Sequence, residues 1–161
     1  MPYNISTEGM EELEQMLRQA GDAAQGAASA GLYDGAGVIA DAVSRAVQGI
    51  ATSPFRYAVG GYKRKPSPEE KALLESAPKG VAKFRKNGIS VDTSVGLSNA
   101  GYGEVNGKRK PIPQIANAIN SGTSFMNKQP FFRKAVSQNA GKALGVMDKK
   151  IREKIEEKLN K

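Results

Sequence analysis

The chain has 161 residues and a mass of 17.1 kDa, a length that fits one domain with a modest hydrophobic core. It contains no cysteine, histidine or tryptophan, which excludes disulfide frameworks, thiolate metal sites, cysteine nucleophiles and imidazole bases. The net charge of +8 is uneven, because residues 1–60 carry three bases and seven acids whereas residues 61–161 carry 21 bases and nine acids.

The first third of the chain predicts two helices with a break between them. Thr7 can cap the first helix, in which apolar residues recur at helical spacing as far as Ala20. The Ala-, Gly- and Ser-rich run that follows predicts a break between Gly21 and Gly31, since each glycine costs about 1 kcal/mol within a helix. Asp34 can cap a second helix that ends at Ser53-Pro54, and its small residues predict close approach of another backbone, within the subunit or across an interface. Short strands are expected over residues 3–5 and 55–59.

Residues 61–88 are expected to form an insertion on the surface. Their short helix begins at the capping box Ser67-Pro68-Glu69-Glu70 and ends before Pro78. Strict alternation of apolar and polar residues over 89–97 predicts the clearest strand of the chain. Asn106-Gly107 is a strong tight-turn signal, so residues 102–105 and 108–110 are expected to pair as a hairpin.

The last third predicts a short helix followed by a long one. Pro113 opens the short helix, which Gly122 can cap. From Pro130 an apolar stripe continues at helical spacing to Leu159 and predicts a helix roughly 40 Å long. The stripe comprises Phe132, Val136, Ala140, Leu144, Met147, Ile151, Ile155 and Leu159. Residues 148–161 form an extended, charged terminal helix that either docks on another element or frays in solvent.

Together these elements indicate a single domain, residues 1–161, of the α+β class. We expect a small, mostly antiparallel sheet packed by helices, with a long C-terminal helix. No run of about 18 apolar residues is present, and residues 1–6 lack the basic and apolar regions of a signal peptide. A cytosolic site of synthesis is therefore expected.

Two patterns resemble catalytic or cofactor motifs, and each has a plainer interpretation. Residues 35–40 match the dinucleotide-binding pattern G-x-G-x-x-A, but an Ala/Gly-rich run stands where a buried strand is needed, and Pro54 follows where an acid is needed. Asp92 and Glu104 could serve hydrolysis as a carboxylate pair, yet no histidine, cysteine or third carboxylate supports them. We therefore predict no enzymatic activity, no bound metal and no cofactor, with a hydrolase as the third hypothesis.

Two basic triplets, Lys63-Arg64-Lys65 and Lys108-Arg109-Lys110, form a more informative pair. Both lie in glycine-flanked loops, and each follows a tyrosine (Tyr62 and Tyr102). Such clusters can contact phosphates while aromatic rings stack on bases, so a nucleic-acid-binding module is the alternative function. No known nucleic-acid-binding signature accompanies them, and solvated loop residues are the simpler interpretation.

The segment from Ile115 to Thr123, read as Ile-Ala-Asn-Ala-Ile-Asn-Ser-Gly-Thr, and the run Gln-Pro-Phe-Phe-Arg-Lys-Ala over 129–135 resemble a bacteriophage family. The family comprises the tail-component or tail-completion (neck) proteins of long-tailed, lambda-like phages. In it, an apolar stretch leads to Gly-Thr, and Pro-Phe-x-x-x-Ala then starts the closing helix. The matching structural positions here are Gly122, Thr123, Pro130, Phe131, Phe132 and Arg133.

The resemblance implies a structural virion protein at the head–tail junction or in the tail, present in the host cytoplasm during assembly. It implies a hexameric ring that docks on head–tail connector proteins and on tail terminator or tube proteins. A closed ring needs two different complementary faces on one subunit, and the charge asymmetry between the two parts of the chain is a source of that complementarity. The basic triplets are then expected to face a neighbouring ring or packaged DNA in the lumen.

Overall fold

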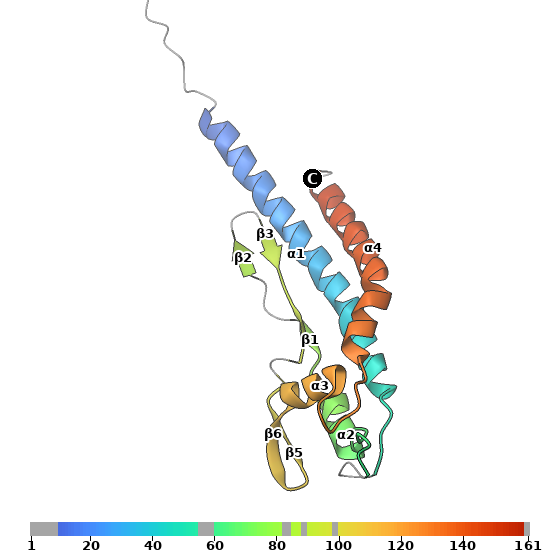
Figure 1. Cartoon of the computed structure of the whole chain (residues 1–161). Coiled ribbons are helices and arrows are strands. Elements are labelled where there is room, and N and C mark those ends of the chain that lie inside the picture. Colours follow the sequence, from blue (N-terminus) through green and yellow to red (C-terminus); the bar gives the residue numbers. More distant parts are fainter. Residues whose placement is uncertain (1–9, 55–59, 82–84, 88–89, 98–99, 160–161) are drawn as a thin grey trace, which may run out of the picture.

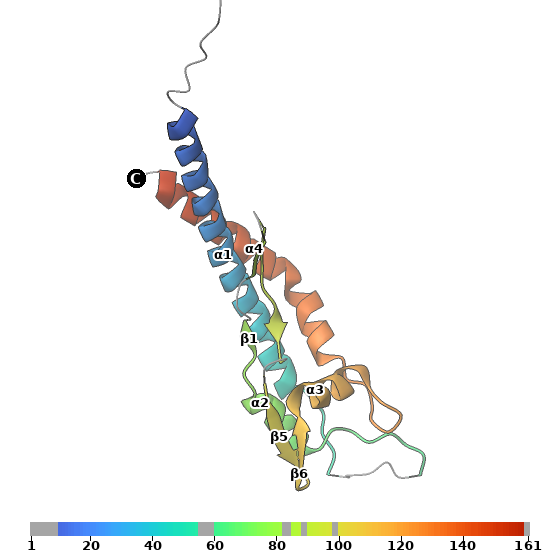
Figure 2. The same cartoon turned by 90° about the vertical axis from the view of Figure 1, so that its left-hand side faces the viewer.

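The computed structural model describes residues 10–54, 60–81, 85–87, 90–97 and 100–159. The α+β prediction is confirmed: these residues form four helices and six short strands in antiparallel pairs, and the C-terminal helix is long (Figure 1). Helices α1 (Met10–Gln48) and α4 (Phe131–Leu159) pack together as an elongated arm. Helices α2 (Pro68–Ser76) and α3 (Ile112–Ser121) gather at one end with strands β5 (Tyr102–Val105) and β6 (Lys108–Pro111), and we call this region the compact end (Figures 1 and 2).

Helix α1 corrects the expected organisation of the first third of the chain. The break between Gly21 and Gly31 and the separate helix start at Asp34 are both wrong, because α1 runs without interruption through these positions. At 1.5 Å per residue its 39 residues span roughly 58 Å. Among the described residues no helix is both long enough and apolar enough to span a membrane.

Close packing between α1 and α4 accounts for two of the glycines in α1, Gly31 and Gly35. A Cβ at Gly31 would lie 2.6 Å from Cγ1 of Ile151, and one at Gly35 would lie 2.4 Å from the Met147 side chain. The Gly35 position also faces the backbone oxygen of Ala143, 3.1 Å from where a Cβ would stand. The absence of side chains lets the two backbones approach, and the contact outweighs the helix cost of about 1 kcal/mol per glycine. The predicted close approach thus occurs within one subunit.

The charged second half of α4 docks on α1. The ammonium of Lys150 lies 3.6 Å from a carboxylate oxygen of Asp34, and Ile151 covers Gly31. The start of α4 directly after Pro130 is confirmed, but the predicted apolar stripe is partly wrong. Phe131, Ala135 and Ala143 are buried, whereas Leu144 is 63% exposed, because the buried face is rotated by about one residue from the predicted one.

The hydrophobic core lies where the arm meets the compact end. Its most deeply buried side chains come from four different elements: Val43, Val47, Leu74, Val105 and Ile119. The stripe predicted for residues 39–50, which follows the last turns of α1 and ends just after the helix at Ile50, therefore faces this core. Helix α2 also contributes to it, so the expectation that residues 61–88 lie on the surface is wrong for the part from Pro66 to Ala77, where five side chains are buried.

The predicted strand over residues 89–97 is interrupted. Within it, β3 (Ser90–Asp92) pairs with β2 (Arg85–Asn87), and β4 (Val95–Gly96) pairs with β1 (Gly80–Val81). Val81 pairs with Val95, and Arg85 pairs with Asp92. The first strand therefore advances four residues between these two pairs, whereas the second advances only three. This one-residue mismatch shifts the register, as a bulge does, and divides the ribbon into two short pieces that lie along α1.

Three local predictions are confirmed. The hairpin of β5 and β6 turns at Asn106 (φ 53°) and Gly107 (φ 71°), the positive angles of a type I′ turn. The capping box begins α2 with both of its hydrogen bonds formed, and Gly122 closes α3. The predicted Thr7 cap and the strands over 3–5 and 55–59 lie outside the described residues.

Candidate functional site

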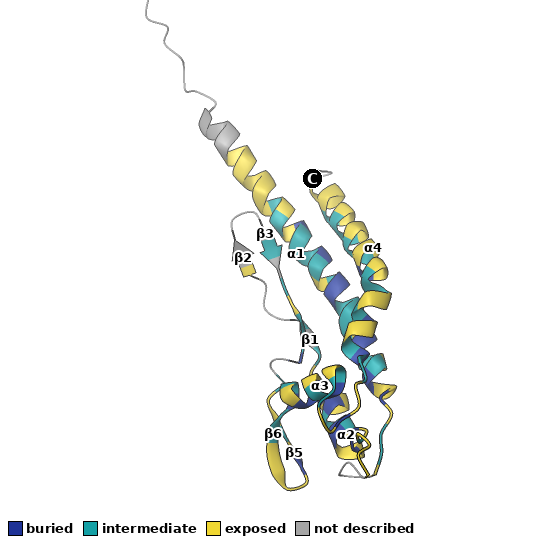
Figure 3. Ribbon diagram, in the orientation of Figure 1, coloured by how far each residue is buried: buried dark blue, intermediate teal, exposed yellow. Residues whose placement is uncertain are grey.

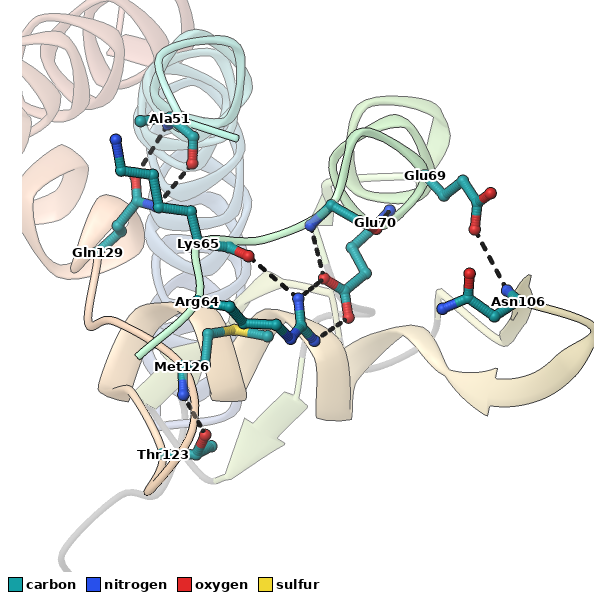
Figure 4. A network of polar contacts seen from close by, with 10 residues as sticks. Ala51, Arg64, Lys65, Glu69, Glu70, Asn106, Thr123, Met126 and Gln129 are labelled. Carbon is teal, nitrogen blue, oxygen red and sulfur yellow. Dashed lines mark hydrogen bonds and ion pairs between the residues drawn. The ribbon is translucent and has the colours of Figure 1, made fainter. Parts of the chain in front are cut away.

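The two basic triplets, far apart in sequence, lie together at the compact end. Arg64 contacts the carboxylate of Glu70, and the positive charge of Lys110 acts on that same carboxylate. One residue earlier on α2, Glu69 accepts a hydrogen bond from the Asn106 backbone N–H at 3.2 Å, which ties the helix to the hairpin tip (Figure 4). The N-terminal turn of α2 thus lies between the triplets.

Arg64 does not face solvent. Its Nη1 and Nη2 donate to the two carboxylate oxygens of Glu70 at 2.7 and 2.8 Å, and both side chains are nearly inaccessible, at 10% and 4% exposure (Figure 4). The guanidinium also lies 5.9 Å from the ring centre of Phe125. Glu70 accepts a further hydrogen bond from the Ser67 backbone N–H at 2.8 Å. The expectation that Arg64 faces DNA or a partner is therefore wrong, because its side chain is held in a structural ion pair that is largely withdrawn from solvent.

The surroundings of Glu70 stabilise its charged form. Burial alone would raise the pKa of Glu70, but hydrogen bonds from Arg64 and Ser67 and the charges of Arg64 and Lys110 outweigh burial, so its pKa lies below the usual value. The hydrogen bond to Glu70 raises the pKa of Arg64 in turn. Both groups are therefore charged at neutral pH, and each compensates the other's loss of water.

This lowered pKa predicts a specific acid sensitivity. A carboxyl group whose pKa falls on folding stabilises the fold fully above its unfolded pKa, about 4.3 for glutamate, and loses that contribution as the pH drops through the folded pKa. Wild-type protein should therefore lose its stability advantage over Glu70→Gln as the pH falls from about 6 to about 3. Urea denaturation of both proteins across this range measures the difference, and a difference that does not change with pH would contradict the prediction.

The remaining cations of the triplets are accessible. Lys63, Lys65, Lys108 and Arg109 are exposed, and Lys110 is half-buried. The Arg109 guanidinium stacks over the ring of Tyr102, 4.7 Å from its centre, while Tyr102 itself is 61% exposed and Tyr62 is 81% exposed. The compact end therefore presents cations with adjacent aromatic rings, as predicted for the triplets apart from Arg64.

The Gly-Thr pair shapes the loop between α3 and α4. Gly122 has φ 77° and ψ 166°, a conformation essentially restricted to glycine, and a Cβ there would lie 3.1 Å from the backbone nitrogen of Lys128. The Thr123 hydroxyl accepts a hydrogen bond from the Met126 backbone N–H at 3.0 Å. Arg64 pairs with this loop through backbone hydrogen bonds to Phe125 and Asn127, so the loop holds the first basic triplet in place.

The Pro-Phe segment anchors the start of α4. Phe131 is buried in the core and contacts the half-buried Phe132 edge to face, with ring centres 6.5 Å apart. Pro130 is half-buried directly before the helix, and Arg133 is exposed. The predicted structural positions 122, 123 and 130–132 therefore act in one joint between α3 and α4.

Two residues of this joint had no role in the sequence interpretation. The side-chain oxygen of Asn120 on α3 accepts from the Phe132 backbone N–H at 3.2 Å and so caps α4 from another helix. The Gln129 amide bonds both backbone groups of Ala51, at 2.9 and 2.8 Å, and ties the chain after α1 to the same joint (Figure 4). No local pattern marks them, since their partners are 12 or more residues away.

The structure does not assemble the two weak catalytic or cofactor patterns. Gly35 and Gly37 lie in the interior of α1, where helical hydrogen bonds occupy the backbone N–H groups that a phosphate loop would need. Asp92 on β3 and Glu104 on β5 belong to different hairpins. Within the described residues, no three potential metal-ligating side chains come together.

Comparison of the chain with protein-family models, with curated proteins and with solved structures gives no match.

Proposed function

We propose that this protein is a structural assembly subunit of a phage virion that completes or joins the tail by forming a ring. The sequence resemblance motivates this proposal, and the shape of the subunit supports it. An arm with one helix of roughly 58 Å extends from a small core and offers more lateral surface than a domain of this length needs to fold. The Gly122-to-Phe132 joint fixes the direction of the arm relative to the compact end.

The observation that carries the proposal is the exposed apolar surface of the arm. Five large apolar side chains on α1 and α4 are exposed by 41–69%: Met16, Leu17, Tyr33, Leu144 and Ile155. Figure 3 shows exposed positions along both helices. Single exposed apolar residues are ordinary, but neighbours that pack along the arm would remove these side chains from water. A subunit that works by contact with its neighbours requires such a surface.

The charge distribution refines how subunits would contact one another. Helix α1 carries six acids and two bases, and α4 carries eight bases and four acids, so their balances of −4 and +4 oppose one another inside the arm. Part of the predicted complementarity is therefore used within the subunit, as the Asp34–Lys150 pair shows. The charge available to neighbours includes the acids that the sequence places in the first turns of α1 and the exposed cations of the compact end.

The oligomeric state of the purified protein tests this proposal. We expect light scattering to give a concentration-dependent species larger than the 17.1 kDa monomer, and electron microscopy to show closed rings, alone or with phage connector proteins. A protein that stays monomeric under both conditions would contradict the proposal.

The second triplet yields a separate prediction. Reversing Lys108, Arg109 and Lys110 to glutamate should impair virion assembly while leaving the fold intact, since Lys108 and Arg109 are exposed and Lys110 is half-buried. Complementation of infectivity measures the effect, and circular dichroism of the purified variant checks the fold. Full infectivity of the folded variant would rule out a contact role for the hairpin.

Nucleic-acid binding is the second candidate function, favoured by the gathering of both triplets beside exposed Tyr62 and Tyr102. A phosphate contact contributes a slope of about one in a log–log plot of affinity against salt concentration. If the compact end binds DNA, the triple reversal at 108–110 should reduce that slope by up to about three. Gel shifts at two salt concentrations separate this function from purely protein-mediated assembly.

A further inference from the structure

A basic groove lies where the C-terminal end of α1 meets the start of α4. It has a volume of about 560 Å³ and runs between residues 42–50 and residues 128–139. Its rim carries the exposed cations Arg45, Lys128 and Lys134, and among the described residues no acid lines it. None of these three side chains forms an ion pair within the part of the chain that the structure describes. An anionic partner would therefore find three available cations.

The floor of the groove indicates what kind of partner fits. Ala42, Ala46, Ile50 and Phe131 are apolar, and the small side chains of α1 leave room for another element to come close. A phosphate backbone gains nothing from such a floor. An amphipathic helix with acids and large apolar side chains would use both the rim and the floor.

The N-terminal end of α1 has the acids and large apolar residues that such a helix needs. Residues 10–22, which we call the tip of α1, carry four acids (Glu11, Glu12, Glu14 and Asp22) and one base, Arg18. The tip extends past the end of α4 in both views of Figures 1 and 2. Within it Met16 is 69% exposed and Leu17 is 64% exposed. The tip thus combines negative charge with uncovered apolar side chains.

We propose that the tip of α1 docks in the basic groove of a second copy of this chain, an inference that rests on the proposed ring assembly. The tip cannot reach the groove of its own molecule, because Leu17 and Arg45 are 28 residues apart on one continuous helix, roughly 42 Å. Two different surfaces at opposite ends of one subunit make a heterologous contact, which closes into a ring when the rotation allows it. The structure therefore assigns both faces of the ring interface.

Cysteine cross-linking tests the contact directly, because the chain has no cysteine of its own. Leu17→Cys in one preparation is mixed with Gln138→Cys in another, since Gln138 is exposed and lines the groove. Ser137→Cys is the matched control: it is exposed on the adjacent position of α4 but does not line the groove. A disulfide requires Cα atoms within about 7 Å, so a neighbouring position that points elsewhere should not react.

We expect mild oxidation to yield a dimer joined between positions 17 and 138, at several times the yield obtained with position 137. Adding Arg45→Glu and Lys134→Glu to the Gln138→Cys chain should abolish this dimer. Adding Glu11→Lys, Glu12→Lys and Glu14→Lys to the Leu17→Cys chain should then restore the dimer, because the charges of the tip and of the groove are both reversed. Such a rescue cannot come from misfolding of either variant.

The other outcomes overturn the inference. Dimers joined 17 to 17 or 138 to 138 would mean a two-fold contact instead. Oligomers in light scattering without the 17–138 cross-link would contradict this interface while leaving ring assembly intact, and the absence of both would contradict both proposals. Loss of DNA binding on reversal of Arg45 and Lys134, without any cross-link, would assign the groove to nucleic acid.

Discussion

Replacing Arg64 with alanine is expected to lower the free energy of unfolding by about 3–5 kcal/mol, the cost of leaving one partner of a buried ion pair without compensation. The Glu70 side chain is 4% exposed, and its carboxylate would lose two hydrogen bonds, at 2.7 and 2.8 Å. Because Glu70 also closes the capping box of α2, its displacement would weaken that helix start. Urea denaturation at pH 7 measures the loss.

Arg152→Ala provides the matched control for this variant. Arg152 pairs with Asp148 at 2.9 Å, nearly the distance of the Arg64 pair, but both side chains are more than 60% exposed. Removing it should leave the denaturation midpoint unchanged, because water replaces the lost partner. The double variant Arg64→Ala, Glu70→Gln should recover part of the loss, since no charge then remains buried. Equal effects of Arg64→Ala and Arg152→Ala would show that burial of the first pair does not matter.

Replacing Gly35 with leucine is the second substitution with a large expected effect. A Cβ alone would stand 2.4 Å from the Met147 side chain and 3.1 Å from the Ala143 backbone oxygen, so α1 and α4 must move apart to admit it. Overpacking of this kind costs typically about 1–3 kcal/mol, and a whole leucine side chain at a backbone contact should reach the upper part of that range. Thermal unfolding monitored by circular dichroism measures the change.

Gly26→Leu is the control for Gly35→Leu, and its effect should have the opposite sign. Gly26 lies on the same helix, is exposed, and has no atom within 4 Å of where its Cβ would stand. Leucine there should stabilise α1 by about 1 kcal/mol through helix propensity alone. Destabilisation of the same size by both leucines would mean that helix packing is not what requires glycine at position 35.

The local elements were predictable because their signals are contained within a few residues. The capping box at Ser67, the type I′ turn at Asn106-Gly107 and the closing glycine at 122 each depend on backbone angles and hydrogen bonds among neighbours. The start of α4 after Pro130 follows for the same reason. The Gly-Thr and Pro-Phe segments lie where α3 closes and where α4 begins, as their glycine and proline indicate, whereas the capping partner Asn120 has no such local signal.

The role of Arg64 could not be predicted from its neighbours in sequence. A run of three bases in a glycine-flanked loop normally indicates solvated side chains, and Lys63 and Lys65 behave that way. Arg64 is withdrawn from solvent because its backbone pairs with the loop around Met126, which directs the guanidinium to Glu70. Contacts between residues 64 and 126 depend on the fold as a whole.

The α+β class, the hairpin, the helix boundaries after residue 66 and the uneven charge can be predicted from the amino-acid sequence alone, because these features depend on local periodicity, turn chemistry and composition. Three features follow only from the packed fold: the continuity of α1 through its glycines, the docking of the charged end of α4, and the accessibility of each cation. Those outcomes depend on free energies of packing and burial between distant segments, which exceed local propensities of about 1 kcal/mol and leave no mark in any short stretch of sequence.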